Sequence, residues 1–418
     1  MLSPGGRLAF YLVAALFFSF GFITCLNDIL IPYCKDLFDL NYKQSGLIQF
    51  SFFSAYFCFS LPSGYIIKKL GYPLAISVGL LISGIGALGF LPAGFFHSYP
   101  MFLSALFVLA CGITLLQVAA NPYTSLLGPK ETAPARLNLV QAFNSLGTAI
   151  APLVGSTLLL NGSSHEGSSW MNIFSQSGEA GFSYFLISCM LFVLMFVFKT
   201  LAHSKQSLPS EFDQKVKSSQ ILEQTQLLLG IVGIFCYVGA EVGIGSFLVN
   251  HISSSWTIPT HEAGQYVSLY WGGAMLGRFV GTYFLTRFRP AHCLAFAASA
   301  AVTLVGASLV ASSHMSPYFL LCVGVFNSIM FPVIFSLSIQ DLGEYRSQGS
   351  AYLCMAIVGG AIFPLIQGGV SDYFGVHYAF AIPMLGYIYI LKFATQASKY
   401  SPLKESEHVQ MKTSMQVL

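Results

Sequence analysis

The polar stretch TLAHSKQSLPSEFDQKVKSSQILEQ, residues 200–224, separates two long apolar halves of a chain of 418 residues. On each side of it, apolar runs of about 20 residues recur, which is the length that a helix needs to cross the hydrocarbon core of a bilayer. Six runs precede the stretch and six follow it. The sequence therefore predicts an all-α membrane protein with twelve transmembrane helices. We place them at residues 8–31, 45–67, 73–95, 101–126, 139–160, 182–199, 225–249, 264–286, 291–312, 317–340, 350–371 and 377–396.

The composition supports this class and excludes others. Hydrophobic residues make up 55% of the chain and charged residues only 8%, whereas soluble proteins carry about 25% charged residues. Nothing in the sequence indicates nucleic-acid binding. The nine cysteines fall in or beside apolar runs without metal-ligand spacing, so we expect no metal site and no disulfide framework.

The distribution of positive charge predicts the orientation. Of the 19 Lys and Arg residues, only Lys35 and Lys43 fall in loops on one side, and Arg278 lies inside a span. The others lie in the loops and tails of the opposite side, which the positive-inside rule assigns to the cytoplasm. We therefore expect a multi-pass protein of the cytoplasmic membrane with both termini inside. Its parts are an N-terminal six-helix bundle (1–199), a cytoplasmic linker (200–224), a C-terminal six-helix bundle (225–396) and a cytoplasmic tail (397–418).

The two halves resemble each other weakly. Pro152 in GTAIAPLVG and Pro364 in GGAIFPLIQG are 212 residues apart, and Pro122 and Pro332 in the preceding spans are 210 apart. Two six-helix halves with internal repeats are the architecture of secondary transporters, which bind substrate near the midplane between the halves.

Three ionisable residues inside the spans are candidates for function, because a charge at the bilayer centre costs at least about 2.5 kcal/mol. Asp28 and Glu241 interrupt the first and seventh spans. Either acid could bind a proton on one side of the membrane and release it on the other. Arg278, in the eighth span, could reach the inner surface or pair with an acid across the helices, and we assign it a gating or structural role.

Neutral polar residues form a second set of candidates. Gln117 and Asn121 share one face of the fourth span, where Pro122 interrupts the helix. Asn138, Gln141, Ser145 and Thr148 form a stripe on the fifth span, with Asn144 on its flank. Amides hydrogen-bond sugar hydroxyls, and an aromatic face packs against the sugar ring. We therefore predict a sugar site lined by Asn27, Gln117, Asn121, Gln141, Asn144, Trp271 and Asn327.

Long motifs identify a family that the chain resembles. They are LNDILIP, QVAANPYTSLLGP, RLNLVQAFNSLGT, YVGAEVGIGSFLVN, YWGGAMLGRFVG, FNSIMFPVIFSL and GGAIFPLIQGGVSD. These motifs are similar to those of the fucose–galactose–hexose symporter family of the major facilitator superfamily. The resemblance implies twelve helices in two pseudo-symmetric bundles, and proton-coupled import of hexoses by alternating access.

The resemblance also implies residue roles. The family's first-span carboxylate falls on Asp28, and its essential fifth-span amide falls on Asn144. Where the fucose transporters carry a glutamate in span 4, this chain has Gln117, and where they carry an amide in span 7, it has Glu241. This departure is typical of the glucose/galactose branch. Lys68 and Lys69 belong to the family's basic inner loop, which here lacks the superfamily's aspartate.

The resulting expectation is a monomeric symporter that imports a hexose of the glucose/galactose type and uses no cofactor. Asp28 is the expected carrier of the coupling proton, with Glu241 as a second titratable or sugar-binding group. Sodium coupling stays open, as do L-fucose and N-acetylglucosamine as substrates. A non-transporting sugar receptor is a further alternative. An enzyme is not expected, because no nucleophile or metal constellation is present in the sequence.

Overall fold

The computed structural model describes residues 4–38, 42–160, 178–203, 221 and 223–400, and these ranges contain helices and no strand. Side chains of some helical residues, among them 26–37 and 152–160, are outside the description. Most of the predicted linker 200–224 and of the predicted tail 397–418 also lies outside the described residues.

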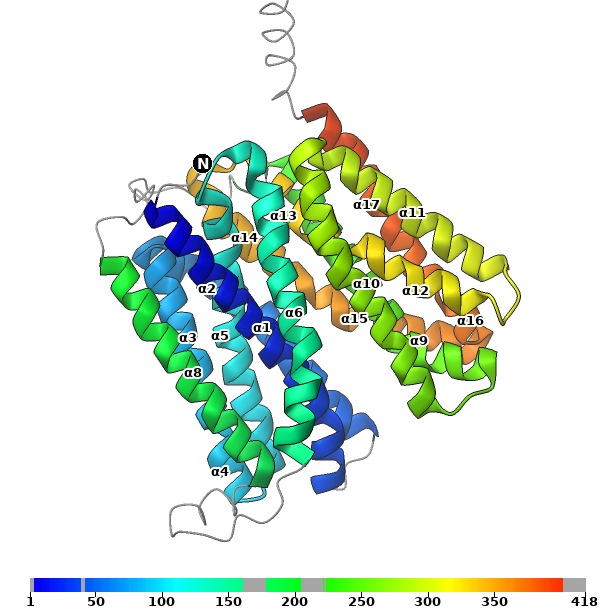
Figure 1. Cartoon of the computed structure of the whole chain (residues 1–418), viewed down its shortest axis with the longest axis horizontal. Helices are drawn as coiled ribbons and strands as arrows, with labels where there is room; N and C mark the ends of the chain where they lie inside the picture. Colours follow the sequence, from blue (N-terminus) through cyan, green and yellow to red (C-terminus); the bar gives the residue numbers. More distant parts are fainter. Residues whose placement is uncertain (1–3, 39–41, 161–177, 204–220, 222, 401–418) are drawn as a thin grey trace, which may run out of the picture.

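The helices before the linker form one group and those after it form another (Figure 1). The first group comprises α1 (Pro4–Leu37), α2 (Tyr42–Leu70), α3 (Tyr72–Leu88), α4 (Phe90–Phe95), α5 (Tyr99–Leu126), α6 (Ala133–Leu160) and α8 (Gly178–His203). The second comprises α9 (Thr225–Trp256), α10 (Thr260–Arg287), α11 (Pro290–Val310), α12 (Ser316–Asn327), α13 (Met330–Ile339), α14 (Arg346–Met355), a 3-10 turn (Ala356–Val358), α15 (Gly359–Phe374), α16 (Val376–Ala379) and α17 (Ala381–Tyr400). We call these groups the N-terminal and C-terminal halves.

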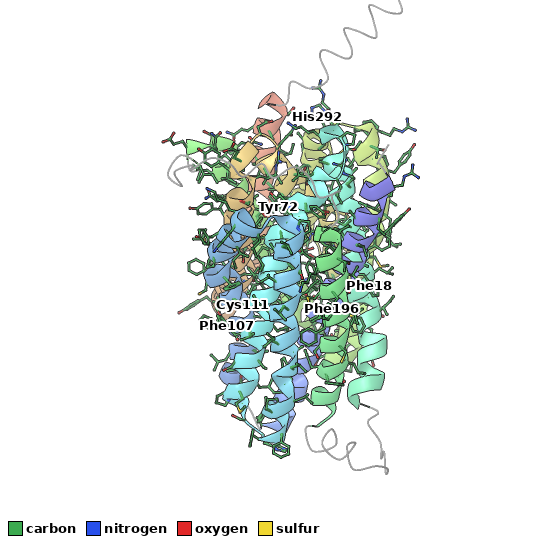
Figure 2. All side chains as sticks on the ribbon, turned by 90° about the vertical axis from the view of Figure 1, so that its left-hand side faces the viewer. Phe18, Tyr72, Phe107, Cys111, Phe196 and His292 are labelled. Carbon is green, nitrogen blue, oxygen red and sulfur yellow. The ribbon has the colours of Figure 1, made fainter. Side chains whose placement is uncertain are left out.

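The helices run roughly parallel to one another and carry apolar side chains on their outer surface (Figure 2). Phe196, for example, is 60% exposed, as expected for a side chain that faces lipid. Ten segments of the described chain are long and apolar enough to cross a membrane. The helices α6 and α10 are not among the ten: α10 is more polar in composition, and the side chains of α6 beyond Ala151 lie outside the description. Both lie at the centre of the molecule, where the halves meet (Figure 1).

Contacts between the halves concentrate at one end of the molecule. There α14 packs against α2 and α5, and α10 packs against α6. Asn138 Nδ2 of α6 donates to the Arg278 carbonyl of α10 at 2.7 Å and to Thr282 Oγ1 at 2.9 Å. From this end the ribbons of the two halves diverge toward the other end (Figure 1). The described N-terminus and the end of α17 lie at the end where the halves touch (Figure 1).

Glycines allow α1 to approach α6 closely. A methyl group on Gly21 would overlap the Asn144 carbonyl, and one on Gly147 would overlap the Phe18 carbonyl. Backbone contact of this kind is typical of small residues at interfaces between membrane helices. The close approach fixes the position of α1 against the helix that carries the predicted sugar ligands Gln141 and Asn144.

Candidate functional site

Arg278 of α10 is one of the residues through which polar groups of the two halves meet. Its Nη1 donates to Ser145 Oγ and, at 3.5 Å, to the Gln141 carbonyl, both on α6. Its Nη2 lies 3.8 Å from Glu241 Oε1 of α9. The side chains of Arg278 and Glu241 are only 12% and 13% exposed. A largely buried cation thus contacts an acid of its own half and neutral acceptors of the other half.

Glu241 is held at ion-pair distance and keeps hydrogen-bonding capacity. Among the described residues, its Oε1 has no hydrogen-bond partner. An oxygen 3.8 Å from a guanidinium nitrogen is attracted electrostatically but lies beyond hydrogen-bond distance. The carboxylate can therefore accept a hydrogen bond from a ligand hydroxyl, or take up a proton, without breaking an existing hydrogen bond at this atom.

The break between α12 and α13 supplies acceptors to this cluster. A helix end leaves its last carbonyls without helical donors, and Pro332 has no N–H to pair with the Ser328 carbonyl. Arg278 Nε donates to the Ser328 carbonyl at 3.3 Å, and Tyr237 Oη donates to the Asn327 carbonyl at 3.1 Å. The broken helix is thereby tied to α9 and α10.

A layer of buried tyrosines supports Glu241. Tyr270 Oη donates to the Glu241 carbonyl at 3.2 Å, and Asn327 Nδ2 donates to Tyr270 Oη at 2.7 Å. Among the described residues, Asn327 Oδ1 and Tyr387 Oη have no hydrogen-bond partner. Asn327 Oδ1 and Glu241 Oε1 are acceptors, whereas the Tyr387 hydroxyl can both donate and accept and faces Asn327 and Tyr270.

In the N-terminal half, two of the predicted amides contact each other and a third binds a tyrosine. Gln141 Nε2 donates to Asn121 Oδ1 at 3.5 Å, and Gln117 Nε2 donates to Tyr56 Oη at 3.0 Å. Asn121 is fully buried, and its side chain faces the Cys354 thiol of α14. Because the Gln141 carbonyl contacts Arg278, the pair formed by Gln141 and Asn121 is connected to the cluster of the other half.

The polar stripe of α6 divides between two neighbours. Asn138, Gln141 and Ser145 point toward α10 and α5. Asn144 and Thr148 bind α1 instead: Asn144 Nδ2 donates to the Phe17 carbonyl at 3.0 Å, and Thr148 Oγ1 donates to the Gly21 carbonyl at 3.3 Å. Asn144 is half-buried, and its amide holds α1 against α6.

The remaining predicted residues lie at the edges of this arrangement or outside the description. Asn27 and Asp28 belong to α1, and their side chains lie outside the described part of the chain. Trp271 is 41% exposed and packs against Gly245 of α9. Lys68 and Lys69 lie in the last turn of α2. They are several helical turns away from Tyr56, the α2 residue that Gln117 contacts.

Sequence reasoning missed the tyrosines that complete the cluster. Tyr237 precedes Glu241 by one helical turn, and this i, i+4 spacing could have pointed to it. Tyr56 and Tyr387 carry no such signal, because each is one of several aromatic residues within an apolar span. The contacts of their hydroxyl groups are made with residues that are distant in the sequence.

Comparison with known proteins gives consistent relatives. The sequence profile of the Major Facilitator Superfamily matches residues 12–355. A glucose/galactose transporter of Brucella abortus is 46% identical over 388 residues, which cover 92% of each chain. A solved structure of the Escherichia coli fucose:proton symporter superposes with a TM-score of 0.83 at 30% identity, covering 94% of this chain and 99% of that one. A structure of the transporter FucP in the outward conformation matches with a TM-score of 0.82, 31% identity and the same coverage.

Proposed function

Since the chain belongs to the major facilitator superfamily, we propose that it imports a hexose of the glucose/galactose type together with protons, by alternating access. The observation that carries this proposal is the polar network from Glu241 through Arg278 to Gln141 and Asn121. It joins the two halves within helices that are otherwise apolar. The Brucella relative, which is a glucose/galactose transporter, supports the choice of substrate.

The proposed orientation places both termini in the cytoplasm of the cell whose inner membrane holds the protein. The contacts between the halves then lie at the cytoplasmic end, and the diverging end faces outward. The similarity to a relative in the outward conformation supports this assignment. In this state, substrate enters from outside, and the halves must separate at the cytoplasmic end to release it.

The proposed sugar ligands come from both halves. Gln117, Asn121, Gln141 and Asn144 act from the N-terminal half, and Asn327 and Trp271 act from the C-terminal half. Amide side chains such as those of Asn121 and Asn327 carry both donors and an acceptor, which suits hydroxyl groups that both donate and accept. Asn27 is a further proposed ligand.

Asp28 is the proposed carrier of the coupling proton, and Glu241 is a second candidate. One charge that crosses 100 mV gains about 2.3 kcal/mol, which corresponds to roughly fortyfold accumulation of sugar. A symporter with one proton per sugar can use this energy, whereas a uniporter cannot. The chain needs no organic cofactor for such a cycle.

The test is uptake of radiolabelled glucose and galactose into membrane vesicles, with competing L-fucose and N-acetylglucosamine. We expect an inward proton gradient to drive accumulation, and a protonophore to abolish it. Accumulation driven by a sodium gradient and insensitive to the protonophore would overturn proton coupling. Competition by L-fucose or N-acetylglucosamine alone would overturn the glucose/galactose assignment.

A further inference from the structure

Two prolines at equivalent places in the halves leave carbonyl groups without helical donors. Pro122 lies in α5 and Pro332 in α13, 210 residues apart. Because proline has no N–H, the carbonyl four residues earlier loses its helical partner. The two carbonyls belong to Val118 and Ser328. In a membrane interior, such a group must find another donor.

Both carbonyls find their donors at the contact between the halves. The Val118 carbonyl accepts from Ser350 Oγ of α14 at 2.7 Å, and this bond crosses directly from one half to the other. Val118 and Ser350 are fully buried. The Ser328 carbonyl accepts from Arg278 Nε at 3.3 Å, and the same guanidinium donates to Ser145 of α6. The second carbonyl is therefore linked to the opposite half through Arg278.

We propose that these two carbonyls anchor the closed contact between the halves, with Ser350 as one latch and Arg278 as the other. This inference rests on the proposed alternating-access function, and it assigns Ser350 a role in the conformational cycle. The helix α14 that carries Ser350 is short and ends in the 3-10 turn Ala356–Val358. A short helix next to a local change of helical type can swing away from α5 without unfolding its neighbours.

The physical cost of removing a latch depends on the state of the transporter. With the halves in contact, loss of the Ser350 hydroxyl leaves the Val118 carbonyl buried without a donor, which costs about 1–3 kcal/mol. With the halves separated, water reaches the carbonyl and replaces the donor. Removal of the hydroxyl therefore shifts the equilibrium toward the separated state, by roughly five- to 150-fold.

The first experiment measures this equilibrium without sugar. Spin labels are attached at the exposed positions Lys130 and Arg287, changed to cysteine in a cysteine-free background, and the distance distribution is recorded in lipid. Ser350→Ala should raise the population of the longer distance at least fivefold. The control is Ser338→Ala, because the buried Ser338 hydroxyl bonds within its own helix, to the Ile334 carbonyl.

The second experiment tests the role of the proline itself. Pro122→Ala gives the Val118 carbonyl a helical donor, so this carbonyl no longer requires Ser350. In that background, we expect Ser350→Ala to shift the distance populations less than about twofold, because no acceptor is left unpaired. Equal shifts in both backgrounds, or no shift in either, would overturn the latch.

The Arg278 latch has its own readout if Pro122→Ala fails to fold. Ser145→Ala removes one of the acceptors on α6 and should shift the distances in the same direction as Ser350→Ala. Distances that match those of the unmodified chain in both serine variants would overturn the proposal. Failure of sugar uptake by the unmodified chain would overturn the proposed function alone, because these distances are measured without substrate.

Discussion

At the scale of single residues, Glu241 and Arg278 compensate each other's charge in a largely buried environment. Breaking a buried ion pair leaves an uncompensated charge, which costs about 3–5 kcal/mol, whereas removing both partners is often nearly neutral. Tyr237, Tyr270 and Tyr387 are the other described ionisable groups that face Glu241. They are neutral at physiological pH in water, so Arg278 is the partner that balances the Glu241 carboxylate.

A double substitution tests this pairing. We expect Glu241→Gln and Arg278→Gln each to lower sugar counterflow roughly 100-fold or more, because each leaves one buried charge. The double variant should recover counterflow to within about tenfold of the unmodified chain. A double variant as inactive as the weaker single variant would contradict the pairing. Accumulation by the double variant with an unchanged pH profile would remove Glu241 from the coupling step.

Asp28→Asn tests the proposed proton carrier. An amide cannot take up the coupling proton, so accumulation driven by a proton gradient should disappear while counterflow of sugar persists. Both are measured in proteoliposomes. Asp341→Asn is the control, because Asp341 is exposed in the link after α13 and should leave both activities intact. Full accumulation by the Asp28 variant would exclude this residue from coupling.

Asn144→Ala separates sugar binding from helix packing. Loss of the amide should raise the apparent Kd for hexose about tenfold, the effect of losing one hydrogen bond. Thr148→Val is the matched control, since it also removes a hydrogen bond from α6 to α1 but leaves the amide in place. Binding titrations on the purified protein in detergent measure both variants. Equal losses of affinity would mean that Asn144 acts only by positioning α1.

At the scale of elements, the ends of helices are secured by side chains from the next element. Arg136 of α6 is buried, and it donates to the Thr124 carbonyl at 3.3 Å, the Ser125 carbonyl at 2.7 Å and the Pro129 carbonyl at 2.9 Å. The first two carbonyls belong to the last turn of α5, and the third belongs to the link that follows it. Burial lowers the pKa of the Arg136 guanidinium to about 10, so it stays charged at neutral pH.

Arg136→Lys should therefore destabilise the protein although it keeps the charge. A single ammonium lacks the planar fork that reaches three carbonyls at once, and the loss should be about 2 kcal/mol. The measurement is thermal unfolding in detergent micelles. Arg287→Lys, at an exposed helix end, is the control and should melt like the unmodified chain. Identical melting curves for both variants would show that these hydrogen bonds contribute no net stability.

At the scale of the whole molecule, the halves touch at one end and diverge at the other (Figure 1). Alternating access requires that this closed contact opens while the divergent end closes. Cys354 of α14 is fully buried and faces Asn121 of α5 across the contact. Its thiol is therefore a reporter of the opening at this end.

We expect a maleimide to modify Cys354 slowly without sugar, and at least several-fold faster when hexose and low external pH are supplied together. The measurement is the alkylation rate in a variant that retains only this cysteine. A variant that retains only Cys111, which is buried on α5, should remain protected in all conditions. An alkylation rate of Cys354 that does not depend on hexose or pH would contradict opening at this end.

The sequence by itself determined the class of the protein, the helical spans and the presence of Asp28, Glu241 and Arg278 within them. These are local properties, because an apolar run of sufficient length and a charge inside it can be read without knowing the neighbours. The repeat of Pro122 and Pro332 was equally readable. The sequence could not tell what the two prolines do, because the missing N–H affects a carbonyl whose new donor comes from a distant part of the chain.

Only the tertiary structure decided which polar groups meet. Arg278 could have turned to the inner surface, but packing of α10 between α6 and α9 brings it to Ser145 and Glu241. Asn144 lies on the flank of the α6 stripe and binds α1 rather than α10. Such partners are separated by more than 100 residues in several of these contacts. Distances of about 3 Å between them depend on the rotation and spacing of whole helices, which no local pattern encodes.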